Sequence, residues 1–520
     1  MTTTTTSIDS GCFTNLARNT NQALGIGRFA IDFMNGAGAP DPAVLERTLL
    51  FHIDATLCGV SAIALGTNAP LVLRKEALEY PKSDGVCFLG STTRVAPEKA
   101  ILADANAVRE WDSNGTNFGF NPDLGHTAGE FGHNDFYAVP LAAAQLAGRD
   151  GAFALRGMVL LDEIRGRLAE VFSLKTYKID HVLHGAIASA ATYGAMLGAT
   201  AEQIESAIGM VVAHFVPFRA IRAGKQLSDS KGASAAISTE AAIVCMQRSM
   251  RGFLGPRDIF RNPEAVFRLF EKTSGDCPFD LVLAHSGRDF AVMGMHFKLG
   301  LYEHQSAGAL QGLVDLLLKH PEIAASAEGI KSIRIVAYEP AFGIIGDPAK
   351  RDPRTRQSAD HSMVFIVSRK LRKAIEAATK GGLPKDNDSV WKQLILEPHD
   401  YDAAAIHDAV TRSLMAKIEF AHGGPEYDRR YPDGIPTSIE ITLADGRTFD
   451  SGLVMYPSGH ARNTTADLKG ILANKFEVLG RLAMDDPKPL IARLHELPRL
   501  EAKALRSIQH FEIADRGRFE

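Results

Sequence analysis

The chain has 520 residues, of which 45% are hydrophobic, and this is enough for two domains that each bury their own core. Its formal net charge of −4 is small, and the sequence contains no basic block or stripe. Neither a nucleic acid nor a membrane surface is therefore expected as a partner.

The five cysteines are scattered along the chain. Even the two closest, Cys58 and Cys87, are 29 positions apart, so neither a disulfide framework nor a zinc knuckle is indicated. No Cys-x-x-Cys pair is present to hold an iron–sulfur cluster. The cysteine pattern therefore points to none of these three kinds of site.

The first ten residues are a threonine-rich run without a cationic start or an apolar segment, and they do not look like a secretory signal. No apolar run elsewhere approaches roughly 18 residues, the length needed to span a bilayer. We therefore expect a cytoplasmic location.

Apolar residues recur at helical spacing through the first half of the chain. Residues 42–65 place Leu45, Leu49, Ile53 and Leu57 at such intervals. Residues 179–198 are dominated by alanine, glycine and serine, which let helix backbones approach closely and suit a crowded core. Further helices are predicted over residues 97–110, 139–148, 151–172, 202–212 and 231–248.

The pattern changes from about residue 291. Residues 332–338 and 438–443 alternate apolar and polar side chains as strands do. A turn at residues 444–447 leads into a returning strand at 448–454, which predicts a hairpin. After Tyr456-Pro457 the chain is helical again, over residues 468–482 and 491–505.

This order of elements predicts a mainly α fold with two domains. An all-helical domain would be built from N- and C-terminal parts, residues 1–290 and 456–520. An α+β lid domain, residues 291–455, would be inserted between them.

Acids, amides and two histidines are concentrated between residues 110 and 135. Such a segment packs poorly, but polar groups on an irregular segment held by a rigid element are well suited to a site. The plain alternative is a solvated surface loop. Asp112 and Thr116 are four positions apart and share a face if this stretch is helical, and His133 lies just before a helix expected to begin at Phe136.

The order Asp112-x-x-x-Thr116 followed by Gly132-His133 resembles the acidic-to-histidine motif of the MmgE/PrpD family, which includes 2-methylcitrate dehydratase and cis-aconitate decarboxylase. Two features depart from that motif: Gly115 replaces the usual acid beside the threonine, and an insertion carrying His126 lengthens the loop. Five further stretches extend the resemblance from about residue 45 to residue 482: Ile179-Asp180-His181, Ser230-Lys231-Gly232-Ala233, Lys298 with Glu303-His304-Gln305-Ser306, residues 352–362 and residues 456–462.

The resemblance implies a homodimer that uses no metal and no cofactor and acts on a small di- or tricarboxylate. Eliminating water from a hydroxy-tricarboxylate requires a base, an acid and several cations. We therefore expect a cofactor-independent hydro-lyase of the 2-methylcitrate dehydratase type. The alternatives are a cis-aconitate decarboxylase-like enzyme, an imino-diacid epimerase-like enzyme, and a carboxylate-binding protein without catalysis.

Four residues are the candidates for catalysis. His133 is the leading base or acid because histidine titrates near neutral pH, and Asp112 would orient an imidazole or share the proton transfer. Both residues could instead be helix caps. Lys231 opens a small-residue helix, where an anion would meet the lysine and free N–H groups, unless the lysine is simply solvated. His181, with His184 as a weaker rival, precedes a crowded helix, and the alternative is a satisfied histidine at a helix start.

Five residues are expected to bind the substrate: Thr116, Lys298, His304, His460 and Arg462. Ordinary surface placement is the alternative for the last four. Phe365 stands where relatives of both dehydratase and decarboxylase type commonly carry a tyrosine. Phenylalanine can neither deliver a proton nor bind a carboxylate oxygen, so we expect water loss or addition rather than release of carbon dioxide.

Overall fold

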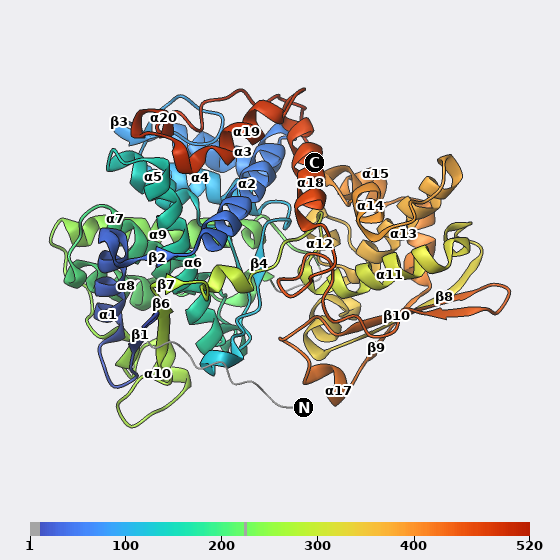
Figure 1. Cartoon of the computed structure of the whole chain (residues 1–520), viewed down its shortest axis with the longest axis horizontal. Helices are drawn as coiled ribbons and strands as arrows, with labels where there is room; N and C mark the ends of the chain where they lie inside the picture. Colours follow the sequence, from blue (N-terminus) through green and yellow to red (C-terminus); the bar gives the residue numbers. More distant parts are fainter. Residues whose placement is uncertain (1–10, 223–225, 520) are drawn as a thin grey trace.

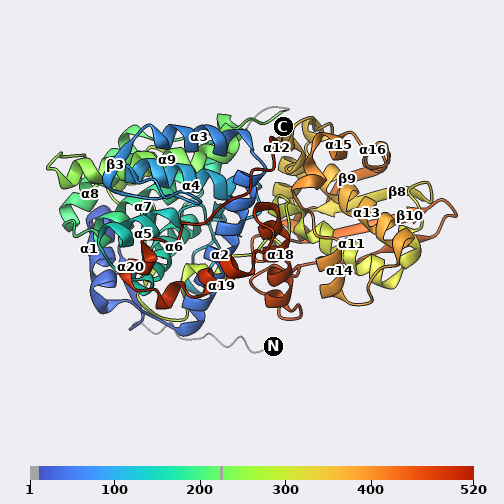
Figure 2. The ribbon, with the colours of Figure 1, turned by 90° about the horizontal axis from the view of Figure 1, so that it is seen from above.

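The computed structural model describes residues 11–222 and 226–519, so the threonine-rich start lies outside the described residues. Two lobes lie side by side (Figures 1 and 2). One lobe is mainly helical and contains the first and last parts of the chain, and the other holds a small sheet with helices around it. This architecture confirms the predicted mainly α fold with two domains.

The helical lobe is packed around helices rich in small residues. α7 (Val182–Met196) packs against α6 (Gly151–Val171) and α9 (Ser230–Met250). A Cβ atom built on Gly185 would lie 2.0 Å from the ring of Phe136, so this close contact needs glycine. The other helices of the lobe are α1 (Gln22–Asp32), α2 (Pro42–Ala64), α3 (Asn68–Leu78), α4 (Pro97–Arg109), α5 (Ala138–Leu146), α8 (Ala201–His214) and α10 (Val266–Phe270).

Short paired strands hold loops of this lobe together through backbone hydrogen bonds. β1 (Phe13–Leu16) pairs with β6 (Leu281–Ala284), and β2 (Ala39–Pro40) pairs with β7 (Ser286–Gly287). β3 (Pro81–Val86) leads toward α4. None of these strands is among the predicted elements, because two to six residues are too few to show a period.

The lid is organised on a four-stranded sheet with the order β11-β10-β8-β9. β8 (Ile330–Ala337) and β10 (Thr437–Leu443) pair antiparallel, which confirms two predicted strands. β11 (Thr448–Asp450) completes the predicted hairpin, whereas β9 (Ile418–His422), parallel to β8, was not predicted. The helices of the lid are α11 (Ala307–Lys319), α12 (Arg356–Ala359), α13 (Met363–Lys380), α14 (Asn387–Gln393), α15 (Ala403–Ile406), α16 (Ala409–Ala416) and α17 (Pro425–Asp428).

After the lid the chain returns to the helical lobe. α18 (Leu468–Ala483) packs along α2. The single helix predicted over residues 491–505 is wrong: α19 (Lys488–His495) and α20 (Ala502–Leu505) are separate, because Pro498 cannot continue a helical hydrogen-bond ladder. Residues Ala291–Gly294 still pack on α2 and α6, and the domain boundaries at residues 290 and 455 remain a proposal.

Within the described ranges, no single helix is both long and apolar enough to cross a membrane. The pair α2 and α3 passes that test only jointly, with a bend of 91° between the two helices.

Lys475 of α18 connects three parts of the molecule. Its ammonium group forms an ion pair with Asp54 of α2 at 2.7 Å, and both side chains are fully buried. It also donates hydrogen bonds to the carbonyl of Ser113 at 2.7 Å and to the carbonyl of Lys298 at 2.8 Å. The returning helix is thereby tied to the core of the helical lobe and to two segments that lead into the site described below.

We predict that Lys475→Met lowers the free energy of unfolding by about 3–5 kcal/mol, because it leaves the Asp54 carboxylate buried without its cation. Lys469→Met on the same helix is the matched control, since Lys469 is exposed and pairs with Glu46 at the surface. The control should change stability by less than about 1 kcal/mol. Chemical denaturation measures both, and equal effects of the two substitutions would contradict the prediction.

Candidate active site

The polar segment that follows α4 folds back on itself. Asp112 has a φ of 50°, a left-handed conformation that does not continue the helix. The expectation that Asp112 and Thr116 share a helical face is therefore wrong. β4 (Thr116–Asn117) pairs antiparallel with β5 (Gly132–His133), and this pairing places Thr116 opposite His133. A strand pairing, rather than a helix, brings the motif residues together.

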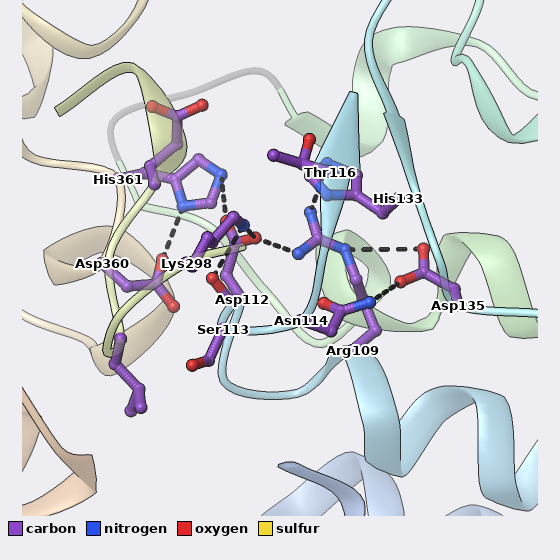
Figure 3. A network of polar contacts seen from close by, with 12 residues as sticks. Arg109, Asp112, Ser113, Asn114, Thr116, His133, Asp135, Lys298, Asp360 and His361 are labelled. Atoms are coloured by element: carbon purple, nitrogen blue, oxygen red, sulfur yellow. Dashed lines mark hydrogen bonds and ion pairs between the residues drawn. The ribbon is translucent and has the colours of Figure 1, made fainter. Parts of the chain in front are cut away.

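Asp112 is the centre of a buried ion-pair cluster (Figure 3). Its Oδ1 atom accepts hydrogen bonds from Arg109 and Lys298, and Lys298 also donates to the Asp112 carbonyl at 2.8 Å. Its Oδ2 atom lies 3.2 Å from Nε2 of His361. Burial acts to raise the pKa of Asp112, but the charges of Arg109 and Lys298 outweigh it and hold the pKa well below its usual value. Asp112 is therefore ionised at neutral pH.

A second buried carboxylate, Asp360, lies beside the first (Figure 3). Its Oδ1 atom is 2.8 Å from the ammonium of Lys231 and 2.6 Å from Nδ1 of His361. Arg356 donates to its other oxygen at 3.2 Å and also pairs with Glu110. Lys231 and Glu110 belong to the helical lobe, whereas Asp360 and Arg356 belong to the lid. These ion pairs therefore join the two lobes.

His133 accepts a hydrogen bond from Arg109, with 3.2 Å between its Nε2 atom and the guanidinium. Because arginine can only donate, Nε2 is unprotonated and the proton of the neutral ring is on Nδ1. Among the described residues, this buried Nδ1 atom has no hydrogen-bond partner. Burial, together with the charge of Arg109, lowers the pKa of His133 well below its usual value. His133 therefore presents a free N–H group.

His181 lies near His133, with 5.1 Å between the ring centroids and the ring planes tilted by 58°. Both of its buried ring nitrogens lack a hydrogen-bond partner within the described part of the chain. Nδ1 lies 3.4 Å from a carboxylate oxygen of Asp180, which itself pairs with Arg222. Burial lowers the pKa of His181 well below its usual value, so this ring is also neutral.

These groups border a small cavity that opens to solvent and is lined from both lobes. Arg219 from the helical lobe and Lys350 from the lid supply positive charge to its lining. In the ranges that the structure describes, neither cation has a carboxylate within 4 Å. The rest of the lining includes Glu303, Gln305 and three apolar side chains, Phe118, Phe131 and Ile344.

Four predicted site residues line this cavity: Asp112, Thr116, His133 and His181. The hydroxyl of Thr116 donates to the carbonyl of Gly132 at 2.7 Å, so it also stabilises the loop. Lys231 and Lys298 are not in the lining. Their ammonium groups bind Asp360 and Asp112, respectively.

The other three predicted residues lie away from this lining. His304 is buried, with its ring 5.4 Å from that of Phe118 and 5.1 Å from that of His296. His460 and Arg462 line a second cavity, and Phe118 borders both cavities. The roles assigned to these residues from the sequence stay predictions.

Several residues of the site were given no role in the sequence analysis. Arg109 had a detectable signal, because it lies three positions before Asp112, a spacing typical of ion pairs near a helix end. Arg219 and Lys350 had no local signal, since their meeting depends on how the lobes pack. A local signal was also lacking for three residues from the stretches that carried the family resemblance: Glu303, Asp360 and His361.

One oxygen or nitrogen from each of Asp112, Asp360 and His361 lies within 4.8 Å of the others, which raises the question of a metal site. Both carboxylates are already bound to protein cations, Lys298 on one side and Lys231 on the other. A metal ion would have to displace these ammonium groups. The donor set therefore does not fit a metal ion, and metal independence remains a prediction.

Comparison with known proteins identifies the family. The MmgE/PrpD N-terminal domain matches residues 32–276, and the MmgE/PrpD C-terminal domain matches residues 394–489. The two matches together cover more than half of the chain. The chain belongs to the MmgE/PrpD family, as its motifs indicated.

Several similar proteins are named as dehydratases. The chain is 26% identical over 462 residues to the mitochondrial 2-methylcitrate dehydratase of Yarrowia lipolytica, covering 86% of this chain and 82% of that one. It is 23% identical over 434 residues to the 2-methylcitrate dehydratase of Escherichia coli K12, covering 78% and 82%. It is 25% identical over 329 residues to an alkylcitrate dehydratase of a fungal species (strain ATCC 74256), covering 62% of this chain and 60% of that relative, which is less than two thirds of its length.

We predict that His133 stays neutral, with its proton on Nδ1, from pH 7.5 down to about pH 6.5, where an ordinary histidine is half protonated. Its pKa is lowered by burial and by Arg109, so protons do not bind in this range. Nitrogen NMR of histidine-labelled protein measures the tautomer, and a His133→Gln spectrum assigns the signal. A His133 signal that titrates near pH 6.5, as an unperturbed histidine does, would contradict the prediction.

Proposed function

We propose that this protein is a hydro-lyase of the 2-methylcitrate dehydratase type, which removes water from, or adds water to, a small hydroxy di- or tricarboxylate without a cofactor. One observation carries the proposal: two neutral histidines, His133 and His181, line the same cavity as two cations, Arg219 and Lys350, that have no carboxylate partner among the described residues. The family and the names of its similar members support the same class.

The substrate carboxylates would bind Arg219 and Lys350. Charge-assisted hydrogen bonds between such cations and carboxylates are stronger than neutral ones. Lys231 and Lys298 would act indirectly, because they neutralise Asp360 and Asp112 and so keep these carboxylates from repelling the substrate.

The two histidines would have different roles. Arg109 keeps the His133 proton on Nδ1, so His133 would donate a hydrogen bond to a substrate oxygen. Within the described residues neither ring nitrogen of His181 has a hydrogen-bond partner, and Asp180 lies beside the ring, so His181 would accept the proton from the carbon next to a substrate carboxylate. The negative charge of Asp180 would stabilise the imidazolium that forms.

The apolar part of the lining suits an alkyl substituent. The rings of Phe118 and Phe131 contact each other edge to face, with centroids 5.6 Å apart, and Ile344 extends the same lining from the lid. A methyl or longer alkyl group loses contact with water when it lies against such side chains. We therefore propose that an alkyl-substituted citrate is preferred over citrate.

We propose dehydration rather than decarboxylation because the similar proteins are named as dehydratases, and Phe365 is not among the described residues that line the cavity. Its side chain is fully buried in α13 and packs against Tyr401, with 5.5 Å between ring centroids. The preference against decarboxylation that Phe365 indicates in the sequence stays a prediction. No observation favours imino-diacid epimerisation or binding without catalysis. A homodimeric state and a cytoplasmic location remain predictions from the sequence.

Turnover by the purified protein tests the proposal. We expect dehydration of 2-methylcitrate, or of a citrate with a longer alkyl group, at a higher kcat/KM than that of citrate. Proton NMR of each mixture identifies the products. Accumulation of itaconate from cis-aconitate would replace the proposal with a decarboxylase, and binding of all substrates without turnover would replace it with a binding protein.

His133→Ala should lower kcat by about 100-fold or more, as loss of a positioned hydrogen-bond donor does in other enzymes. The fold should be kept, because this residue is at a short strand pairing rather than in the apolar core. His399→Ala, at an exposed histidine, is the matched control and should retain full activity. Wild-type rates for His133→Ala, with an unchanged circular dichroism spectrum, would remove His133 from the mechanism.

A further inference from the structure

Glu303 is a carboxylic acid in the cavity lining to which no function has been assigned. It precedes the short helical turn His304–Ser306, and its Oε2 atom accepts a hydrogen bond from the backbone N–H of Gln305 at 2.8 Å. Its own backbone N–H donates to the carbonyl of Asp360 at 3.0 Å. The residue is thus fixed at two points beside the ion pairs that join the lobes.

One oxygen of the Glu303 carboxyl group remains available. Across the described residues, no hydrogen-bond donor or cation is found within bonding distance of Oε1. The side chain is only partly buried, and it borders the same space as His133 and His181. A carboxyl group anchored by one oxygen and open at the other is well placed to contact a bound molecule.

The surroundings of Glu303 favour its protonated form. Burial and the negative charge of Asp112 raise its pKa to about 7, whereas Lys298 and Lys350 act in the opposite direction. Two buried tyrosine hydroxyls near it, those of Tyr338 and Tyr431, have no hydrogen-bond partner among the described residues. Burial and the nearby negative charge both disfavour the ionised form of the carboxyl group.

The other acids and imidazoles in the described lining are each held in a single protonation state at neutral pH. Asp112 stays ionised because of Arg109 and Lys298. Burial keeps His133 and His181 neutral. Dehydration nevertheless needs a proton for the departing hydroxyl group, since hydroxide is a poor leaving group.

We propose that Glu303 is the catalytic acid of this site, and that its carboxyl group contacts the substrate hydroxyl and donates the proton with which that hydroxyl leaves as water. The inference rests on the proposed function. The C–H bond breaks and its proton goes to His181, the electron pair forms the C=C bond, the C–O bond breaks, and the oxygen takes the proton of Glu303. Exchange with solvent then returns the proton to Glu303 and removes one from His181.

Glu303→Gln tests this role without removing the anchor, because the amide oxygen can still accept the Gln305 N–H. We expect kcat for dehydration to fall by about 100-fold or more, in the range of general acid catalysis. We also expect the wild-type kcat to decline above about pH 7, where Glu303 loses its proton, and this decline to disappear in Glu303→Gln. Glu303→Asp should restore part of the rate and the decline. Glu328→Gln, at an exposed glutamate of the lid, is the matched control and should behave as wild type.

Isotope-edited infrared spectroscopy adds a readout that needs no substrate. The wild-type spectrum minus that of Glu303→Gln should contain a protonated carboxyl band that disappears as the pH rises from 6 to 8. Either of two results would overturn the role of Glu303 and leave the proposed function in place. One is absence of this band at pH 6, and the other is a dehydration rate of Glu303→Gln within threefold of that of an active wild type. Failure of the wild type to dehydrate any hydroxycarboxylate would overturn the proposed function itself.

Discussion

Pairing of buried charges across the two lobes is the constraint on which the site depends. Asp112 of the helical lobe binds Lys298 at the start of the lid, and Lys231 of the helical lobe binds Asp360 of the lid. An unpaired charge at any of these positions would cost several kcal/mol in the buried interior. These pairs form in the arrangement of the lobes that the structure shows. That same arrangement places His133, His181 and Glu303 around a single cavity.

The pairing also determines which cations remain available to bind a ligand. Lys231 and Lys298 neutralise protein carboxylates, and Lys475 behind them binds Asp54. Arg219 and Lys350, which come from different lobes, face the cavity without such partners in the described ranges. A carboxylate ligand would thus neutralise the positive charges of Arg219 and Lys350, which no carboxylate of the described residues pairs with.

Much of this architecture could be predicted from the sequence, because helical spacing and strand alternation are local. The helix expected over residues 42–65 is α2, and the alternating residues 332–338 fall largely in β8. The motif residues Asp112 and His133 do line one cavity. The position of these two residues relative to each other could not be predicted from the sequence, because it depends on the strand pairing of Thr116 with His133 across a long loop. Lys298 is paired with Asp112, a partner that no local pattern in the sequence shows, and its expected role in substrate binding stays a prediction.

The central claim is that the cavity between the lobes binds a carboxylate substrate through Arg219 and Lys350. A crystal structure with tricarballylate, a tricarboxylate that lacks the hydroxyl group and cannot be dehydrated, tests it most directly. The account predicts carboxylate oxygens within about 3 Å of both cations, with the unreactive ligand beside His133 and His181. Tricarballylate bound only in the second cavity, against His460 and Arg462, would contradict it.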